Sequence, residues 1–277
     1  MLKMRIDANS SHIRHGDILS SLRGEVSDLS EVGKTGGDYA RLTRSAILIR
    51  DGRNRAAAIS SPEGAPSDPH LHEDFNEWWI ILAGEVSYTI GEYETFAAHF
   101  GDIVIAPAGY RHAPTPTKGD QCVRVVVGLQ HSNHDLKGIP PSRTVPLDNL
   151  PPPNRIWTPL DYMIERHGVD EPWAEQVLLD QRNRANMIHQ LPGQSNRPHW
   201  HPDMDEWWVV LKGELEWRVG NKQPFRACRG DFVFVEAGYS HEIVTVGSES
   251  SIRLAVTSPD VVHHFLDDPN APRPPQG

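Results

Sequence analysis

The sequence predicts a mostly β protein made of two equivalent domains, and three observations support this prediction. The chain has 277 residues, and residues 69–85 align without a gap with residues 198–214, at an offset of 129 positions. Each copy consists of short apolar runs separated by Gly, Pro, Asn and Asp, which is typical of short strands joined by turns. At roughly 150 residues per domain, the length also fits two compact domains.

The expected strands follow the apolar runs of each copy in order. In the first copy these runs are residues 45–51, 56–60, 77–91, 102–109 and 123–129. Many short strands at close spacing favour a sandwich or a barrel. We therefore expect two β barrels in tandem.

The extent of the repeat sets the expected domain boundaries. We place the first barrel at 42–131 and the second at 171–266. Between them, 132–170 is rich in Pro and is interpreted as an extended linker. Residues 1–41 have no counterpart in the repeat and form an N-terminal arm with one short helix near 17–26. The tail, 267–277, has a composition that predicts mobility.

Charge and composition exclude several classes of function. The formal net charge is −10, which disfavours nucleic-acid binding because that affinity depends on basic contacts to phosphate. No apolar run reaches the roughly 18 residues of a membrane span, and the N-terminus lacks the apolar stretch of a signal peptide. The two cysteines, Cys122 and Cys228, form no C-x-x-C pair. We expect a cytoplasmic protein without nucleic-acid or membrane partners.

Histidine is the residue type in excess, with 15 copies, and part of the excess follows a fixed spacing. In the first copy an H-x-H pair precedes a Glu by five positions, and another His follows a Pro-Ala-Gly turn. The second copy repeats this spacing. The eight positions are His70, His72, Glu77, His112, His199, His201, Glu206 and His241.

Strand geometry explains the spacing. Residues i and i+2 of a strand face the same side, so both histidines of each H-x-H pair point inward. Turn-forming residues before Glu77 and Glu206 break the strand and reset the face, so that each Glu also points inward. Three imidazoles and one carboxylate suit a divalent transition metal such as Fe, Mn, Co, Ni or Zn. We expect one such ion in each domain, with two coordination positions left open for substrate, water or dioxygen.

These motifs resemble the two conserved motifs of the cupin superfamily, G-x5-H-x-H-x4-E-x6-G and G-x5-P-x-G-x2-H. In the second copy Glu236 replaces the Pro of the latter motif. The resemblance implies a bicupin: two tandem double-stranded β-helix (jelly-roll) barrels, each with a metal ion at its mouth. It also implies a homodimer, because cupins commonly pair through exposed strands.

Five further residues are candidates for contact with substrate. Trp79 and Trp208 share the inward face with the glutamates and offer an aromatic wall. Tyr110 and Tyr239 lie two residues before the last histidine, and Arg111 beside that histidine is able to clamp a carboxylate.

Three functional hypotheses remain open. The favoured hypothesis is an Fe(II)-type dioxygenase that cleaves a small enolic, phenolic or diketone substrate, as in flavonol-cleaving bicupins. A second is a decarboxylase, isomerase or lyase in which Mn, Ni or Zn acts as a Lewis acid, with Glu73 or Asp203 as proton donor. The third is a non-enzymatic sensor or storage protein. In the first two hypotheses the partner is a small molecule, anionic or aromatic in character.

Overall fold

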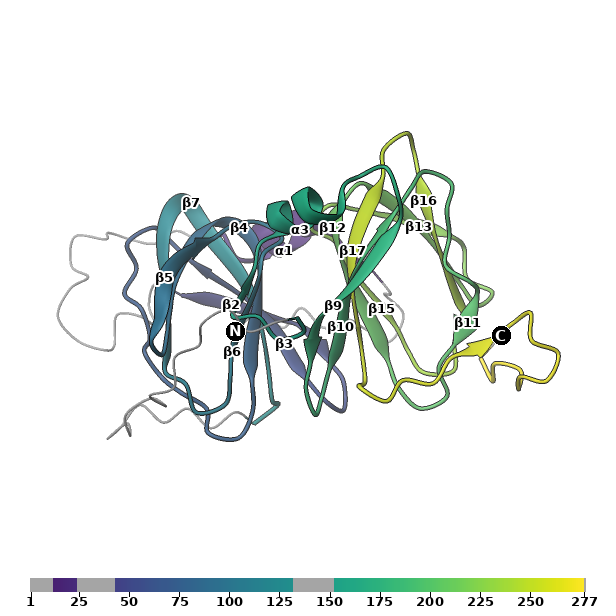
Figure 1. Ribbon diagram of the computed structural model, residues 1–277, viewed down its shortest axis with the longest axis horizontal. Coiled ribbons are helices and arrows are strands. Elements are labelled where there is room, and N and C mark those ends of the chain that lie inside the picture. Colours follow the sequence, from purple (N-terminus) through teal and green to yellow (C-terminus); the bar gives the residue numbers. More distant parts are fainter. Residues whose placement is uncertain (1–11, 24–42, 132–151, 277) are drawn as a thin grey trace. The chain divides into compact units, whose positions relative to one another are not determined.

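The computed structural model describes residues 12–23, 43–131 and 152–276, and the chain divides into two compact units. The first unit comprises 16–162 together with 1–5, and the second comprises 163–277 together with 6–15. Both are built almost entirely from antiparallel strands (Figure 1). The predicted all-β class with a short N-terminal helical arm is confirmed.

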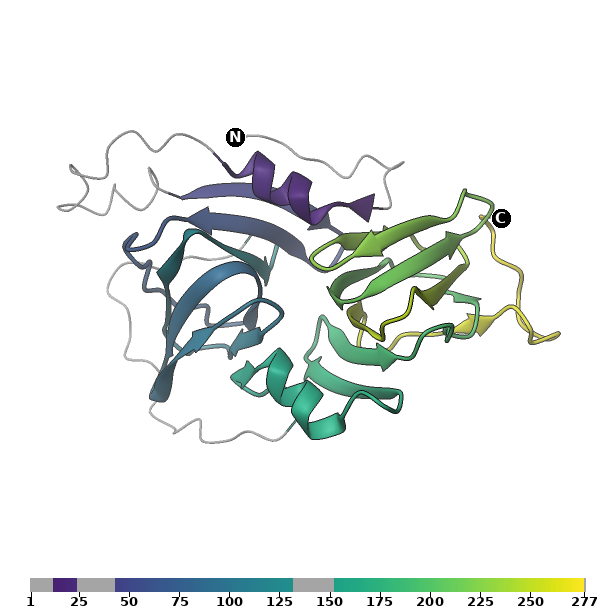
Figure 2. The same ribbon diagram turned by 90° about the horizontal axis from the view of Figure 1, so that it is seen from above.

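The first unit contains one seven-stranded sheet of order β2-β3-β7-β4-β6-β8, with β5 paired to β4. Figure 2 shows these blue and teal strands curving around a common interior. The two long strands, β4 and β7, pair with each other over most of their length. The strand bounds are β2 Arg44–Arg50, β3 Arg55–Ser61, β4 Glu77–Ile90, β5 Tyr93–Ala98, β6 Ile103–Ala106, β7 His112–Gly128 and β8 Trp157–Thr158.

The second unit contains a six-stranded sheet, β1-β15-β12-β17-β10-β9, and a five-stranded sheet, β14-β13-β16-β11-β18, which face each other in Figure 1. The bounds in the first sheet are β1 His12–Ile13, β9 Trp173–Leu179, β10 Arg184–Gln190, β12 Glu206–Lys212, β15 Phe232–Val235 and β17 Ser251–Thr257. Those in the second are β11 His199–Trp200, β13 Glu214–Val219, β14 Phe225–Cys228, β16 His241–Val246 and β18 His264–Phe265.

Each barrel interior holds an equivalent apolar cluster. In the first unit the cluster includes Trp79, Ile81 and Tyr88, and in the second it includes Trp208, Val210 and Trp217. Inward-facing residues alternate with outward-facing ones along β4 and β12, as the period of a strand requires. Packing of these clusters leaves one end of each barrel for polar side chains.

A short strand completes one edge of each barrel, and this feature extends the repeat beyond what the sequence reveals. β1 pairs with β15, and β8 pairs with β6 at the equivalent position. Helix α1 (His15–Ser21) follows β1, and helix α3 (Leu160–His167) follows β8. The arm therefore has a counterpart in residues 157–167, which the Pro-rich composition assigns to the linker.

Two equivalent aspartates anchor these edge strands. Asp102 accepts hydrogen bonds from Leu160 N (2.9 Å) and Trp157 Nε1 (3.1 Å). Asp231 accepts them from His15 N (2.7 Å) and His12 Nε2 (2.8 Å). The two arms share almost no sequence, so the match is visible only in their backbone pairing.

The C-terminal tail, for which the composition predicts mobility, makes contacts with the second unit. Residues 267–276 lie against the second unit: Arg197 pairs with Asp267, and Gln276 N donates to Gly238 O. An ion pair and backbone hydrogen bonds thus hold a segment whose composition alone predicts mobility. No helix in the described part of the chain has the length and apolar character to cross a membrane.

Replacing Asp102 or Asp231 by Ala leaves three donors without this acceptor, because His99 N also donates to Asp102 and Cys228 N also donates to Asp231. We expect each variant to lose about 1–3 kcal/mol in the free energy of unfolding, measured by urea denaturation. Asp120→Ala, at an exposed position of the first unit, is the control. Urea denaturation midpoints of the Asp102 and Asp231 variants that equal the midpoint of the control would show that these aspartates do not anchor the edge strands.

Candidate metal centres

The first candidate centre lies at the end of the first barrel where β4 and β7 begin. Glu77 opens β4 and His112 opens β7, while His70 forms a β-bridge with His112. His112 Nε2 is 3.0 Å from His70 Nε2 and 3.1 Å from Glu77 Oε2, and His72 Nε2 is 3.4 Å from Glu77 Oε1. All four side chains are buried, so four donor groups converge in an interior of low polarity.

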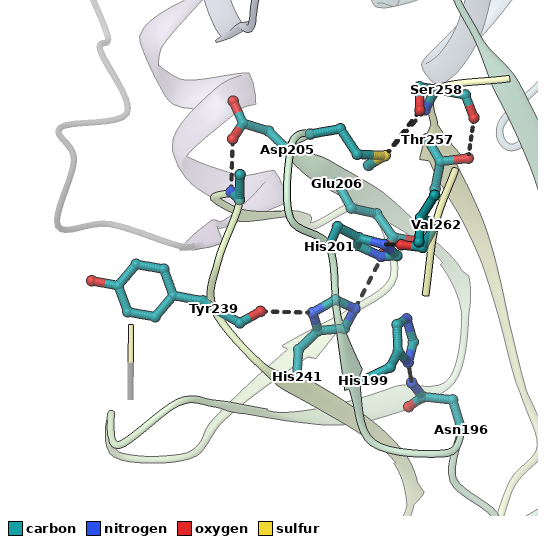
Figure 3. A network of polar contacts seen from close by, with 12 residues as sticks. Asn196, His199, His201, Asp205, Glu206, Tyr239, His241, Thr257, Ser258 and Val262 are labelled. Atoms are coloured by element: carbon teal, nitrogen blue, oxygen red, sulfur yellow. Dashed lines mark hydrogen bonds and ion pairs between the residues drawn. The ribbon is translucent and has the colours of Figure 1, made fainter. Parts of the chain in front are cut away.

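The second candidate centre repeats this arrangement (Figure 3). His199 opens β11, Glu206 opens β12 and His241 opens β16. Glu206 Oε2 is 2.7 Å from His201 Nε2 and 3.2 Å from His241 Nε2. In each centre the donor atoms lie within 4.8 Å of one another.

The turn before each glutamate is tied to the turn before the last histidine. Asn76 Oδ1 accepts a hydrogen bond from Ala108 N, and Asp205 Oδ1 accepts one from Ala237 N. Gly109, with a positive φ of 82°, donates its N–H to His72 O. These contacts fix the strand break that the spacing predicts, and so they bring the Glu onto the same side as the histidines.

Backbone carbonyls orient the imidazole rings. Because a carbonyl oxygen only accepts, each Nδ1 that contacts one carries the proton, and Nε2 is left as a lone pair. The pairs are His70 with Asp68 O (2.7 Å), His112 with Tyr110 O (3.1 Å), His199 with Arg197 O (2.7 Å), His201 with Val262 O (2.7 Å) and His241 with Tyr239 O (3.4 Å).

The donor set fits a metal ion. In the first centre the Nε2 atoms of His70 and His112 face each other at 3.0 Å, and both rings carry their proton on Nδ1. Two lone pairs at this distance repel each other unless a cation lies between them. Neutral imidazoles and one carboxylate are suitable ligands for a divalent transition metal.

The pKa values of the ligand residues follow from burial and from their mutual contacts. Burial alone would raise the pKa of Glu77, but hydrogen bonds that the three histidines donate in their protonated form hold this pKa well below its usual range. Glu206 behaves in the same way. Burial lowers the pKa of His199 to about 3, with a further contribution from His241. Both glutamates are therefore carboxylates, and His199 stays neutral.

The structure distributes the five other candidate residues around the centres. Trp79 and Trp208 lie in the barrel cores, with ring centroids 5.1 and 5.2 Å from His112 and His241. Tyr110 is buried in the same core as Trp79.

Tyr239 directs its carbonyl to His241 while its ring points away from this histidine (Figure 3). Lys222 Nζ lies 4.6 Å from the centroid of that ring. Arg111 is half-buried and accepts a hydrogen bond from Gly91 N. Substrate contact by these residues stays a prediction.

His263 lies near the second centre, although no motif in the sequence predicts a role for it. The ring of His263 lies 4.7 Å from that of His199 and 4.8 Å from that of His201. The signal for it is the repeat itself, because His134 occupies the matching position in the first copy. His134 lies outside the described residues.

Comparisons with known proteins agree on one family. Residues 59–128 and 186–258 each match the family described as "Cupin domain". No curated protein matches significantly.

Several solved structures share the fold. A cupin 2 conserved barrel domain protein from Leptotrichia buccalis is 13% identical, with a TM-score of 0.63 over 92% of this chain and 98% of that chain. An oxalate decarboxylase–formate complex from Lactobacillus farciminis is 18% identical, with a TM-score of 0.53 over 81% of this chain and 83% of that chain. Oxalate decarboxylase from Bacillus subtilis at pH 4.6 is 16% identical, with a TM-score of 0.51 over 81% of this chain and 74% of that chain. At these identities the likeness concerns the fold.

Metal content tests the two centres separately. After reconstitution with Mn(II), we expect two ions per chain by elemental analysis. Glu77→Ala and Glu206→Ala should each retain one ion, because each removes the only carboxylate of one centre, and the double variant should retain none. Glu85→Gln, an acidic position outside both centres, is the control. A double variant with undiminished metal content would contradict the assignment.

The stability gained from metal should depend on pH. Burial opposes protonation of His70 and His201, but hydrogen bonds to Glu77 and Glu206 outweigh it and raise both pKa values. The raised pKa values stabilise the metal-free fold below the ordinary histidine pKa of about 6.5, and this stabilisation is lost as pH rises through the folded values. Protons compete with metal for the same nitrogens.

We therefore expect the Mn(II)-induced increase in Tm to be larger at pH 8 than at pH 6, as measured by differential scanning fluorimetry. An increase that does not change with pH would contradict proton competition at these histidines.

Proposed function

Because the chain belongs to the cupin family, with one cupin domain in each half, we propose that it is an enzyme that holds one divalent metal ion in each domain. The observation that supports this proposal is the pair of buried clusters of three histidines and one glutamate. A non-enzymatic storage protein has no need for two such clusters. A sensor that binds DNA is the less favoured alternative, because the formal net charge of −10 disfavours contacts to phosphate.

The ligand residues define what the site is able to do. A bound divalent ion would act as a Lewis acid toward a coordinated oxygen of the substrate. Glu77 and Glu206 each offset one of the two positive charges, so each loaded centre keeps a net charge of about +1 and attracts anions. Carbonyl contacts at Nδ1 hold the imidazoles in one orientation, and the buried setting excludes water from the donor atoms.

For the reaction, we propose non-oxidative cleavage of a small carboxylic or keto acid, with decarboxylation as the first candidate. The structural neighbours include oxalate decarboxylases, one of them described with Mn(II) centres. This support changes the order of the sequence-based hypotheses, in which the dioxygenase comes first. Mn is accordingly the first metal to test.

The dioxygenase is the second candidate. Four protein donors leave two positions on an octahedral ion, which accommodate a substrate oxygen together with dioxygen. The aromatic residues next to the fourth histidine, Trp79 and Trp208, are compatible with an enolic or phenolic substrate. Under this proposal the ion is Fe(II).

Assembly and location are two further predictions. The homodimer rests on the family resemblance, and the cytoplasmic location stays a prediction. Size-exclusion chromatography with light scattering tests the first.

Product analysis distinguishes the two reactions. We expect the Mn(II)-loaded protein to release CO2 from at least one member of a panel of short dicarboxylic and keto acids, with less than one equivalent of O2 consumed per turnover. Glu77→Ala/Glu206→Ala should lose this activity, whereas Glu85→Gln should retain it. Stoichiometric O2 uptake by the Fe(II)-loaded protein with diketones or phenols would instead establish the dioxygenase.

A further inference from the structure

The repeat contains a second pair of equivalent polar residues that the metal centres do not use. Arg55 and Arg184 are the first residues of β3 and β10. Each follows a turn in which an aspartate accepts hydrogen bonds from two backbone N–H groups: Asp51 from Arg53 and Asn54, and Asp180 from Arg182 and Asn183. The turn fixes where the strand begins, and therefore which side of the sheet the arginine faces.

The register places Arg55 in one row with the glutamate of the first centre. Arg55 pairs with Gly128 across β3 and β7, and Trp78 pairs with Val127 across β7 and β4, so Glu77 lies beside Gly128. A Cβ at Gly128 would be 3.6 Å from Glu77 Oε1, which confirms this neighbourhood. Since Glu77 faces the interior, residues in its row face the interior too.

Gly128 between the two charged residues has no side chain. Neighbouring strands are about 4.8 Å apart, so an arginine two strands away reaches the space next to the carboxylate. Arg55 therefore lies on the interior face of the sheet, in the same row as Gly128 and Glu77.

The second unit repeats this row. Arg184 pairs with Thr257, and Trp207 pairs with Val256, so Glu206 lies beside Thr257. Arg184 thus lies in the same row as Glu206, two strands away.

In the part of the chain that the structure describes, neither arginine has an anionic partner within ion-pair distance. Within 12–23, 43–131 and 152–276, neither forms an ion pair, and Nε of Arg184 is buried without a hydrogen-bond partner. In the first unit Arg55 also lies directly across from Arg50, and like charges at paired positions destabilise a sheet. Each site therefore combines a cation-binding cluster with a guanidinium that forms no ion pair among the described residues.

We propose that Arg55 and Arg184 are substrate-binding residues, each of which holds one carboxylate of a small dicarboxylate or keto acid whose other oxygens face the metal position. A guanidinium binds a carboxylate through two parallel N–H···O bonds, which fixes both the charge and the orientation of the substrate. Arg111, the sequence-based candidate for this role, has no equivalent arginine in the second copy, where Ser240 occupies its position. The inference rests on the proposed function, because it names the substrate class of the same centres.

The first unit carries an additional positive charge. Arg50 lies across from Arg55, whereas Leu179 is the residue before the corresponding turn of the second unit. We expect the first centre to bind a dianion more tightly than the second.

The test measures binding of oxalate, as the smallest dicarboxylate, to Mn(II)-loaded protein by isothermal titration calorimetry. Single-centre backgrounds separate the two sites: Glu206→Ala leaves the first centre, and Glu77→Ala leaves the second. In these backgrounds Arg55→Gln and Arg184→Gln should each raise the Kd of oxalate about 10- to 100-fold. Arg55→Lys and Arg184→Lys, which keep the charge but lose the paired hydrogen bonds, should fall between Gln and the parent.

Matched controls are Lys118→Gln for the first centre and Arg218→Gln for the second, both at exposed positions. Manganese content and Tm of every variant establish that the site and the fold are intact. An oxalate Kd within threefold of the parent in the Gln variants, or in the Lys variants where a Gln variant does not fold, would overturn the inference. Arginine-dependent oxalate binding without CO2 release from any acid would leave the inference standing and contradict the proposed function.

Discussion

The facing lone pairs of histidine in a buried interior are the constraint on which the rest of this molecule depends. At the mouth of the first barrel the Nε2 atoms of His70 and His112 lie 3.0 Å apart, next to the carboxylate of Glu77. Such a group is unfavourable without a cation and favourable with one. Four side chains from separate segments must come together to form such a cluster. Strand pairing brings them together once in each barrel.

Rows of residues at paired positions across neighbouring strands place charged side chains at the two centres. The row that contains Glu77 continues through Gly128 to Arg55, and the row that contains Glu206 continues through Thr257 to Arg184. Below these rows, Trp79 and Trp208 pack under the fourth histidine of each site and close the barrel core. The apolar clusters below these rows stabilise the barrel.

The sequence predicts the clustering of these eight side chains well because the position of each depends on local rules. The alternation of a strand determines the face of His70 and His72, and a short turn determines the face of Glu77. The offset between the two copies then identifies every ligand twice. The all-β class follows from the same short apolar runs.

Other features depend on pairing between distant segments, for which the sequence carries a weak signal. The edge strands β1 and β8 are two residues long, and their match rests on backbone hydrogen bonds to Asp102 and Asp231. Arg55 and Arg184 are aligned by the repeat, but their place in the row of the glutamate requires the register of three strands. The contact of His263 with the second centre requires the return of β18 to β11.

The central claim is that each barrel holds its metal between the four converging side chains. Anomalous diffraction recorded near the manganese absorption edge from crystals of the Mn(II)-loaded protein tests it most directly. The account predicts two peaks per chain, one within coordination distance of His70, His72, Glu77 and His112 and the other within coordination distance of His199, His201, Glu206 and His241. Peaks located elsewhere, or none at these positions in a fully loaded crystal, would contradict it.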